Sequence, residues 1–329
     1  MDDEDQNGAI RRSRPCFLVW GFVLFVVTFG VTPGARGTSY TIVTAPEEAD
    51  GEGKGINDSG QIVGFTAGAN PQGFLSSGGS LTPISVPGAL DTKPFDINNA
   101  GQIVGSNVLA FNGTQGFLYS GGHFTTISVP GAVATDARGL NDAGQIVGRS
   151  FDAFGGHSQG FLYSGGSFSP INVPGAEFTE AYGINNAGQI VGAYGVASDP
   201  GHYLGFLYSG GHFTTIHFPG GTFAGTDALG INDAGVIVGF TGFLGGPVHQ
   251  GILNSEGTFT IINPVPPAIG LRATGINDAG QIVGALEFPP APRIPEPSSI
   301  ELLAVSMITL WSSWMWWRRG ASNVPRRRT

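Results

Sequence analysis

Short apolar runs, each ended by a glycine-rich turn, recur along the middle of the chain. The unit His123 to Gly166 holds four of them: Phe124 to Val129, Arg138 to Asn141, Gln145 to Gly148 and Gln159 to Tyr163. Their β-branched and aromatic residues favour strands. Pro-Gly, Asp-Ala-Gly and Ser-Gly-Gly separate the runs and are typical of tight turns. The unit therefore predicts four short antiparallel strands in roughly 43 residues, which is the size of one β-propeller blade.

The apolar residues in these runs are consecutive rather than alternating. Ile146-Val147 and Phe161-Leu162-Tyr163 are two examples. Because successive side chains of a strand point to opposite sides, both sides of the predicted sheet must be covered. Blades stacked face to face cover both sides, whereas a one-sided meander leaves one side in water. No helical periodicity occurs in the repeats.

The turn motif Ile-Asn-Asp-Ala-Gly-Gln-Ile-Val-Gly occurs six times, at intervals of 41 to 47 residues. A repeat of this length indicates a repeat architecture. The motif Gly-Phe-Leu is clear only at Gly73, Gly116, Gly160 and Gly205 and is degraded at Gly251. The sixth unit stops after Leu286. We predict an all-β, propeller-like array of about six four-stranded blades. The last is incomplete, with three strands, and closure joins first and last blades; an open or imperfect array is the alternative.

Two residues of the turn motif are predicted to be structural. Asn or Asp suits the start of a short hairpin loop, and glycine suits its left-handed position. These residues are Asn57, Asn98, Asn141, Asn185, Asn232 and Asn277, with Gly60, Gly101, Gly144, Gly188, Gly235 and Gly280. Asp58, Asp142, Asp233 and Asp278 follow four of the asparagines. Calcium is an alternative reading, but a calcium loop gathers more oxygens than each turn offers, so we predict no cofactor.

Composition and charge exclude a disulfide framework and one class of partner. The chain has 329 residues with 55 glycines and 22 prolines. It has a single cysteine, Cys16, so a disulfide framework is excluded. Residues 38–297 hold 19 acidic and six basic residues. Such a surface repels phosphate backbones, and nucleic acid is not an expected partner.

The N-terminus has the parts of a secretory signal. Arg11, Arg12 and Arg14 precede the apolar run Cys16 to Val31, and Ala35-Arg36-Gly37 places small residues at the −3 and −1 positions. This pattern predicts cleavage after Gly37. An uncleaved signal anchor is the alternative, because four acidic residues precede the arginines.

The C-terminus has a second apolar segment, Ile300 to Trp317. Its 18 residues reach roughly 27 Å as a helix, just enough for the bilayer core. The basic residues that follow stay in the cytoplasm by the positive-inside rule, so the repeats face the other side. We expect two terminal hydrophobic helices. The predicted parts are a signal peptide (1–37), the propeller (38–286), a proline-rich linker (287–299), a transmembrane sorting helix (300–317) and a basic cytoplasmic tail (318–329).

The C-terminal arrangement resembles the PEP-CTERM sorting signal. That signal combines Pro-Glu-Pro, an apolar helix and a basic end, carried here by Pro295, Glu296, Pro297, Arg318, Arg319, Arg326, Arg327 and Arg328. The resemblance implies processing by a membrane-embedded exosortase after export by the secretion translocon. Carriers of the signal are surface or extracellular proteins of Gram-negative bacteria that make exopolysaccharide. Departures from the pattern are Glu301 within the apolar part and ten residues beyond Arg319.

The repeats themselves resemble the HAF repeat of bacterial extracellular proteins. The resemblance covers residues 40–285 and rests on Gly-Phe-Leu-Tyr-Ser-Gly-Gly, Val-Pro-Gly-Ala and Gly-Ile-Asn-Asp-Ala-Gly-Gln-Ile-Val-Gly. It implies an exported repeat protein and carries no established enzymatic activity.

No constellation of residues predicts catalysis or a metal. The histidines, His123, His157, His202, His212, His217 and His249, show no zinc spacing and are expected to be exposed. Ser-Gly-Gly lacks the nucleophile elbow. Glu47, Glu48, Asp50 and Glu52 are expected to form a solvated acidic loop rather than a glycosidase pair. We therefore expect no enzyme.

Two non-enzymatic functions remain. The first is a structural or interaction scaffold of the extracellular matrix, with exopolysaccharide or matrix proteins as partners and a transient stay in the inner membrane. The second is a binding module for a saccharide or protein through the variable loops Arg149 to Ser158, Tyr194 to Tyr203 and Thr241 to Gln250. Its candidate residues are Phe151, Phe154, Tyr194, Tyr203 and Phe243.

Overall fold

A computed structural model describes residues 27–29, 40–43, 51–110, 113–152, 157–197, 203–219, 224–243, 248–264 and 266–289. Residues 1–288 form one compact unit that contains every described strand, and a second unit begins at Pro289. The predicted sorting helix and basic tail lie outside the described residues. No helix in the described part of the chain is long and apolar enough to cross a membrane.

The prediction of a β-propeller is confirmed. Five blades are antiparallel sheets of four consecutive strands. They are β3 (Gly51–Ile56), β4 (Ile62–Thr66), β5 (Gly73–Ser77) and β6 (Ser80–Ile84); β7 (Ala89–Ile97), β8 (Ile103–Leu109), β9 (Gly113–Ser120) and β10 (His123–Ile127); β11 (Ala134–Leu140), β12 (Ile146–Phe151), β13 (Ser158–Ser164) and β14 (Ser167–Ile171); β15 (Phe178–Ile184), β16 (Ile190–Gly195), β17 (Tyr203–Ser209) and β18 (His212–Ile216); and β19 (Ala224–Ile231), β20 (Ile237–Phe243), β21 (His249–Ser255) and β22 (Thr258–Ile262).

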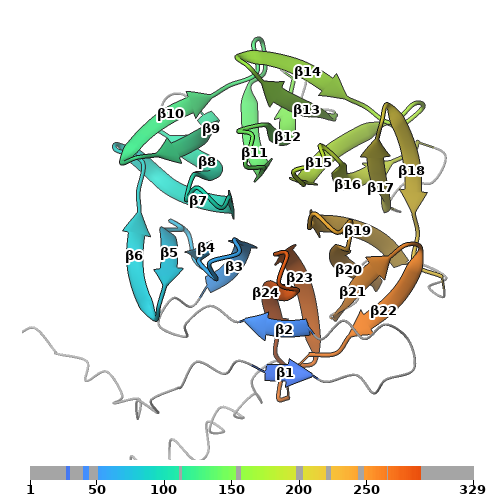
Figure 1. Cartoon of the computed structure of the whole chain (residues 1–329). Helices are drawn as coiled ribbons and strands as arrows, with labels where there is room; N and C mark the ends of the chain where they lie inside the picture. The colour runs from blue at the N-terminus through green and yellow to red at the C-terminus, as the bar shows by residue number, and fades with distance from the viewer. Residues whose placement is uncertain are drawn as a thin grey trace, which may run out of the picture. The chain divides into compact units, whose positions relative to one another are not determined.

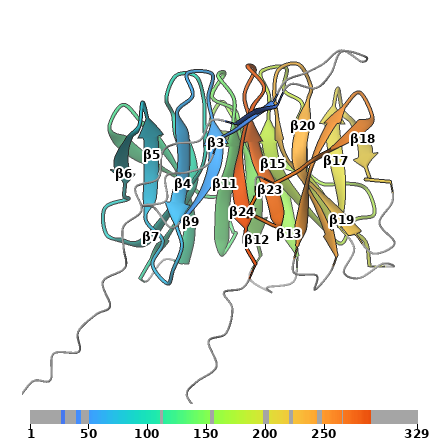
Figure 2. The ribbon, with the colours of Figure 1, turned by 90° about the horizontal axis from the view of Figure 1, so that it is seen from below.

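The blades surround a central axis (Figure 1), and their strands run along it when the ring is seen edge on (Figure 2). The first strand of each blade is innermost and the fourth is outermost. The turns that join first to second strands, such as residues 141–145, lie on one side, here named the turn face. The connections from second to third strands and from fourth strands to the next blade lie on the other side, the loop face.

The sixth sheet has a mixed origin. β23 (Gly270–Ile276) and β24 (Gln281–Glu287) come from the sixth repeat, but β2 (Tyr40–Val43) and β1 (Val27–Phe29) come from the N-terminal region. β2 pairs with β24 in parallel, and β1 pairs with β2 in antiparallel orientation. Val27–Phe29 is therefore a strand where the sequence predicts a hydrophobic helix.

First strands are longer than the sequence suggests. β11 begins at Ala134, whereas the apolar pattern predicts a start at Arg138. The early half of the strand carries Asp136, whose side chain lies near the axis rather than in a hydrophobic interface, so no apolar pattern marks it. β12 extends to Phe151, which shortens the predicted variable loop.

The hydrophobic core lies between neighbouring blades. In one cluster, Val147 and Ile171 of one blade pack with Ile184, Ile190 and Phe206 of the next, and all are at most 6% exposed. Burial of such side chains contributes about 1.5–3 kcal/mol each. Second strands contribute side chains to clusters on both of their sides, which explains why their apolar residues are consecutive.

Candidate functional site

The turn face is held by a ring of buried asparagines. Asn141 is 3% exposed. Its Oδ1 accepts a hydrogen bond from the Gln145 backbone N–H at 3.0 Å, and its Nδ2 donates to Gln145 Oε1 at 2.8 Å and to the Asn185 carbonyl of the next blade at 3.1 Å. A side-chain amide supplies both a donor and an acceptor, which a carboxylate does not. This geometry explains why asparagine recurs at this position of the turn.

The same bond from Nδ2 to the next asparagine carbonyl occurs at all six turns and closes the ring. The distances lie between 2.9 and 3.2 Å for Asn57 to Asn98, Asn98 to Asn141, Asn141 to Asn185, Asn185 to Asn232, Asn232 to Asn277 and Asn277 to Asn57. The glycines of the six turns have φ between 73° and 75°, in the left-handed region that favours glycine.

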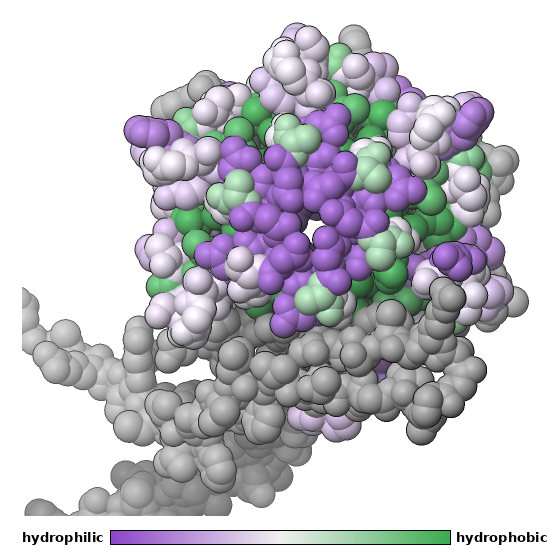
Figure 3. All heavy atoms as spheres, in the orientation of Figure 1, coloured by the Kyte–Doolittle hydropathy of each residue, from purple (hydrophilic) through white to green (hydrophobic). Residues whose placement is uncertain are grey.

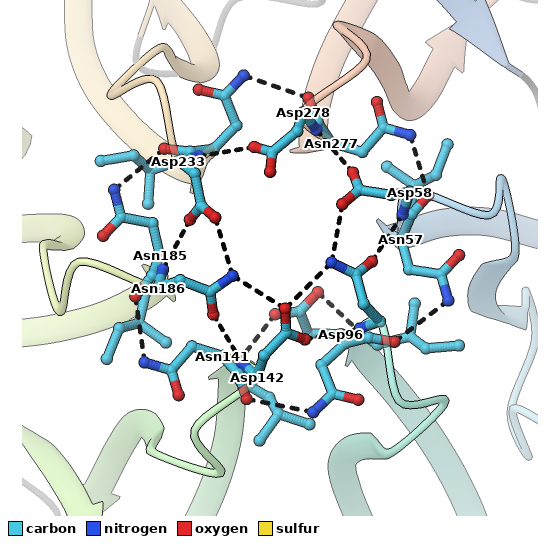
Figure 4. Close-up of a pocket in the computed structure, with 18 of the residues that line it drawn as sticks. Asn57, Asp58, Asp96, Asn141, Asp142, Asn185, Asn186, Asp233, Asn277 and Asp278 are labelled. Carbon is cyan, nitrogen blue, oxygen red and sulfur yellow. Dashed lines mark hydrogen bonds between the residues drawn. The ribbon is translucent and has the colours of Figure 1, made fainter.

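The residues that follow these asparagines form a second ring (Figure 4). Each backbone N–H donates to Oδ1 of its counterpart in the next blade, at 2.7 to 2.9 Å. Asn99 Nδ2 bridges Asp58 and Asp142 at 2.8 and 3.1 Å, and Asn186 Nδ2 bridges Asp142 and Asp233 at 2.9 Å each. The acidic residues at the turns therefore accept hydrogen bonds from neighbouring turns.

The alternation of acid and amide breaks at Asp278. Its neighbours in the ring are Asp233 and Asp58, so three carboxylates follow one another. Burial and these two charges raise the pKa of Asp278 above its ordinary value. The ring lines a small polar cavity, and a central opening is visible in the polar patch of this face (Figure 3). No group of three or more His, Cys, Asp or Glu side chains within the described ranges is arranged to hold a metal ion.

Asp96 lines both this cavity and a second one, together with Ile56, Ile184, Ile231 and Ile276. It stands where other first strands carry glycine, as at Gly139. Its Oδ1 and Oδ2 accept hydrogen bonds from the backbone N–H groups of Ile97 and Leu140, each at 2.9 Å. Burial raises the pKa of Asp96 to about 7.

The basic residues of the described propeller are concentrated near the axis. All five, Lys54, Lys93, Arg138, Arg149 and Arg272, form ion pairs, and four of them lie on first strands. Lys54, Arg138 and Arg272 lie two or four residues before the Ile or Leu that ends their strand. This spacing is visible in the sequence and is the signal that could have predicted the cluster.

Two ion-pair networks form toward the loop face. Arg149 pairs with Asp136 at 2.9 Å and with Glu180 at 2.8 Å, joining two blades, and Ser158 donates to Glu180 at 2.7 Å. Burial alone favours neutral carboxyls, but the nearby arginines hold the pKa values of Asp136 and Glu180 below their ordinary range.

The second network joins β3 to the sixth sheet. Arg272 pairs with Glu52 at 2.7 Å and lies 3.4 Å from Glu287, and Glu52 also pairs with Lys54. Glu52 was predicted to lie in a solvated acidic loop, and that prediction is wrong: it lies in β3 and is ion-paired. Its companions Glu47, Glu48 and Asp50 lie outside the described residues.

Asp227 is the exception among these acids. Its backbone pairs with Phe240 in the sheet, but no hydrogen bond or ion pair to its carboxyl group occurs within the described ranges. Burial, and secondarily the charge of Glu180, raises its pKa to about 7.

The predicted loop aromatics divide into two kinds. Tyr194 is not a loop residue: it lies in β16, is 8% exposed, and its hydroxyl is 2.9 Å from the hydroxyl of Thr215. Tyr203 is 40% exposed and packs edge-on against Phe178. Phe151 and Phe243 belong to β12 and β20, and Phe154 lies outside the described residues.

Exposed apolar side chains on the loop face were missed by sequence reasoning. Leu90 and Val133 are 53% and 54% exposed, Ile269 is 41% exposed, and Phe288 is 58% exposed. Each lies where a first strand begins or β24 ends. Leu90 and Val133 both follow Pro-Gly-Ala. An apolar residue after this repeated turn is the signal in the sequence that could have predicted their exposure.

Among the histidines, His249 departs from the expectation of free exposure. It lies at the start of β21 and its ring contacts Glu287, while the Phe240 ring packs edge-on against it. His123 and His212 are exposed at the starts of β10 and β18, and His217 is also exposed. His157 is exposed too, 3.8 Å from Glu177. His202 and the sorting-motif residues Pro295, Glu296 and Pro297 lie outside the described residues.

Comparison with known proteins supports the fold. No protein-family model matches the sequence, and no curated protein matches it significantly. A TolB-type protein from Agrobacterium tumefaciens is similar in structure, with a TM-score of 0.55 and 9% identity over 73% of this chain and 91% of that chain. TolB from Acinetobacter baumannii has a TM-score of 0.49 and 16% sequence identity, with 62% of this chain covered. This chain spans about half, 52%, of the length of that TolB chain. SapL1 lectin, solved in complex with alpha methyl fucoside, has a TM-score of 0.44 and 12% sequence identity, with 65% of this chain and 80% of that chain covered. At these identities the likeness concerns the fold alone.

Proposed function

We propose that this chain is an exported repeat protein whose propeller serves as an interaction scaffold in the extracellular matrix, contacting partners through the loop face. The observation that carries the proposal is the contrast between the two faces. On the turn face, buried amides and ring carboxylates bond to one another. On the loop face, ion pairs near the axis are accompanied by exposed Leu90, Val133 and Ile269. Apolar side chains gathered at one end of a rigid scaffold are typical of an interaction surface.

Export is part of the proposal and rests on the two terminal signals. The signal peptide ending at Gly37 delivers the repeats across the membrane, and the PEP-CTERM-like end directs processing by an exosortase-type enzyme. The HAF-like repeats support the same assignment. The sheet β1-β2-β24-β23 would then act as the sixth blade, and cleavage after Gly37 would leave it with three strands.

A saccharide-binding module is the second candidate, favoured by Tyr203, which is exposed beside Phe178 on the loop face. An aromatic face of this kind suits the apolar side of a sugar ring. We do not propose catalysis, because the acids of the two loop-face networks are engaged in ion pairs and the acids of the turn ring accept hydrogen bonds from neighbouring turns. Asp96 and Asp227 belong to neither set.

The mass and location of the protein in its own host test the export proposal. The natural product is expected to begin near Thr38, to end near Pro297 and to leave the cell. A chain with Pro295, Glu296 and Pro297 replaced by alanine is expected to stay in the membrane fraction. Identical mass and location for both chains contradict the sorting role.

A further inference from the structure

The sixth sheet carries a fourth-strand sequence in the third-strand position. Tyr40-Thr-Ile-Val of β2 matches Phe124-Thr-Thr-Ile of β10, and Tyr40 precedes Asn57 by 17 residues, as Phe124 precedes Asn141. In the other blades this motif forms the outermost strand. Here β2 instead hydrogen-bonds directly to the second strand, β24.

The direction of β2 agrees with its sequence. Strands alternate in direction within each complete blade, so a fourth strand runs parallel to the second strand of its own blade. β2 runs parallel to β24, with Thr41 opposite Gln281 and Val43 opposite Val283. β2 thus has the sequence and direction of a fourth strand, and the third strand between it and β24 is missing from the repeat.

Gly284 marks the place that the missing strand leaves. In four blades the equivalent glycine lies opposite a third-strand phenylalanine, in the pairs Gly64–Phe74, Gly105–Phe117, Gly148–Phe161 and Gly192–Phe206. A Cβ on these glycines would meet a carbonyl oxygen of the first strand at 2.0 to 2.2 Å and the phenyl ring at 2.6 to 2.8 Å, so the ring packs directly on the glycine. At Gly284 the nearest atoms are backbone atoms of Arg272 and Ala273, and the pairing with β2 ends at Val283.

The core beside this position is small. Among the described side chains, the cluster between the sixth sheet and the first blade contains Ile56, Ile62 and Val283. The corresponding cluster between β8 and the third blade has six buried members, including Ile127 of the fourth strand β10, and Leu118 of the third strand β9 packs against it. Among the described side chains, the cluster beside β24 has no counterpart of the third-strand Leu118.

We propose that the sixth sheet accepts an extended strand of a partner polypeptide in the third position, antiparallel to β24, with β2 moved outward to the fourth position. The partner strand has the Gly-Phe-Leu pattern of the resident third strands β5, β9, β13 and β17. Its phenylalanine packs on Gly284, and backbone hydrogen bonds to β24 and β2 hold it. A second copy of this chain is not the proposed occupant, since its own Gly-Phe-Leu strands are already paired within blades.

The inference rests in part on the proposed processing. Removal of residues 1–37 takes away β1, which pairs with β2 through Val27, Thr28 and Phe29. β2 is then held on one edge only, by β24, and is free to move outward. The complete blade that results has the strand order of the other five.

A labelled peptide tests the acceptor position. The probe is Ser-Gln-Gly-Phe-Leu-Tyr-Ser, the sequence of β13, added to the protein purified as the host releases it, with its first residue read from its mass. We expect saturable binding by fluorescence anisotropy and at least tenfold weaker binding of the peptide with alanine for phenylalanine. Placing the control in the peptide leaves the protein fold untouched.

Hydrogen exchange then locates the bound peptide. New protection is expected in β24 and β2 and not in β8 or β12. No saturable binding, equal binding of the alanine peptide, or protection elsewhere overturns the proposal, and self-association that protects β24 replaces the partner by a second copy. A protein that still begins at Met1 contradicts the proposed export processing, whereas a processed protein that binds no peptide contradicts the acceptor site alone.

Discussion

At the scale of single residues, the repeated asparagine carries the most structural information. Its amide is the one side-chain group at the turn that accepts from its own hairpin and donates to the next blade at the same time. The sequence predicts its role in the turn. The bond to the neighbouring blade could not be predicted, because it joins residues 41 to 47 positions apart.

Replacing Asn141 with alanine tests this role. The substitution removes the partners of the Gln145 backbone N–H and of Gln145 Oε1 and leaves the Asn185 carbonyl with the Gly188 N–H alone. The free energy of unfolding is therefore expected to fall by about 2–4 kcal/mol. Asn232→Ala is the matched control, since Val236 stands where Gln145 does and one hydrogen bond fewer is lost. Urea unfolding measures both, and a loss for Asn232→Ala as large as that for Asn141→Ala contradicts the account.

Asp227 sets a pH dependence of stability. Its pKa in the folded protein is raised to about 7, so folding favours its protonated form and stability falls as pH rises from about 4 to about 7. Asp227→Asn is expected to gain at least about 1 kcal/mol at pH 8, since one pKa unit corresponds to about 1.4 kcal/mol, and to match the parent chain below pH 4.

Asp136→Asn is expected to change the pH dependence of stability in the opposite direction. The pKa of Asp136 is lowered by Arg138 and Arg149, so its ionised form stabilises the fold at neutral pH and this contribution is lost as pH falls. The variant is expected to be less stable than the parent at pH 7. Thermal unfolding from pH 3 to pH 8 checks both variants, and parallel curves for all three proteins would refute the assignment.

At the scale of elements, the blade follows closely from the pattern of apolar runs and turns. Four strands and their order are predictable because β-formers and glycine turns recur at fixed places. The lengths of the first strands are not, because residues such as Asp136 and Arg138 face the axis and interrupt the apolar pattern. For a similar reason Tyr194 was placed in a loop, although β16 continues past the last residue of the motif.

Alanine substitutions at two glycines of one repeat distinguish the stability cost of close packing from the cost of an unfavourable backbone conformation. A Cβ on Gly148 would lie 2.0 Å from the Asp136 carbonyl oxygen and 2.8 Å from the Phe161 ring, so Gly148→Ala is expected to cost at least about 3 kcal/mol. Gly144 has φ of 75° and open space around it, so Gly144→Ala is expected to cost only about 1–2 kcal/mol. Equal losses in urea unfolding would show that strand packing at Gly148 is not as close as described.

At the scale of the whole molecule, the ring of turns closes through Asn277 and Asn57, 220 residues apart. The repeat count predicts that first and last blades meet. The composition of the sixth sheet was beyond sequence reasoning, because β1 lies in a segment with the pattern of a signal peptide and the pairing of β2 with β24 depends on the absence of a third strand.

The polar ring offers a test of closure. Asp278→Asn would place an amide between Asp233 and Asp58 and complete the alternation of acids and amides, so a higher melting temperature is expected, with an effect of no more than about 1 kcal/mol at this exposed site. Asn99→Asp should lower the melting temperature, because five acidic positions then follow one another around the ring, from Asp233 through Asp278, Asp58 and position 99 to Asp142. Both differences should shrink in 1 M salt, and a lower melting temperature for Asp278→Asn contradicts the bonding described for the ring.

The loop face is proposed to carry the interactions of an exported scaffold. Binding to the host's own extracellular matrix fraction, measured by co-sedimentation, tests it most directly with three proteins: the parent chain, the double variant Leu90→Ser with Val133→Ser, and the control Leu81→Ser, which alters an exposed apolar side chain of β6. The account predicts that the parent and the control bind alike and that the loop-face variant binds at least tenfold more weakly. Failure of the parent to bind, or equal binding by all three proteins, contradicts it.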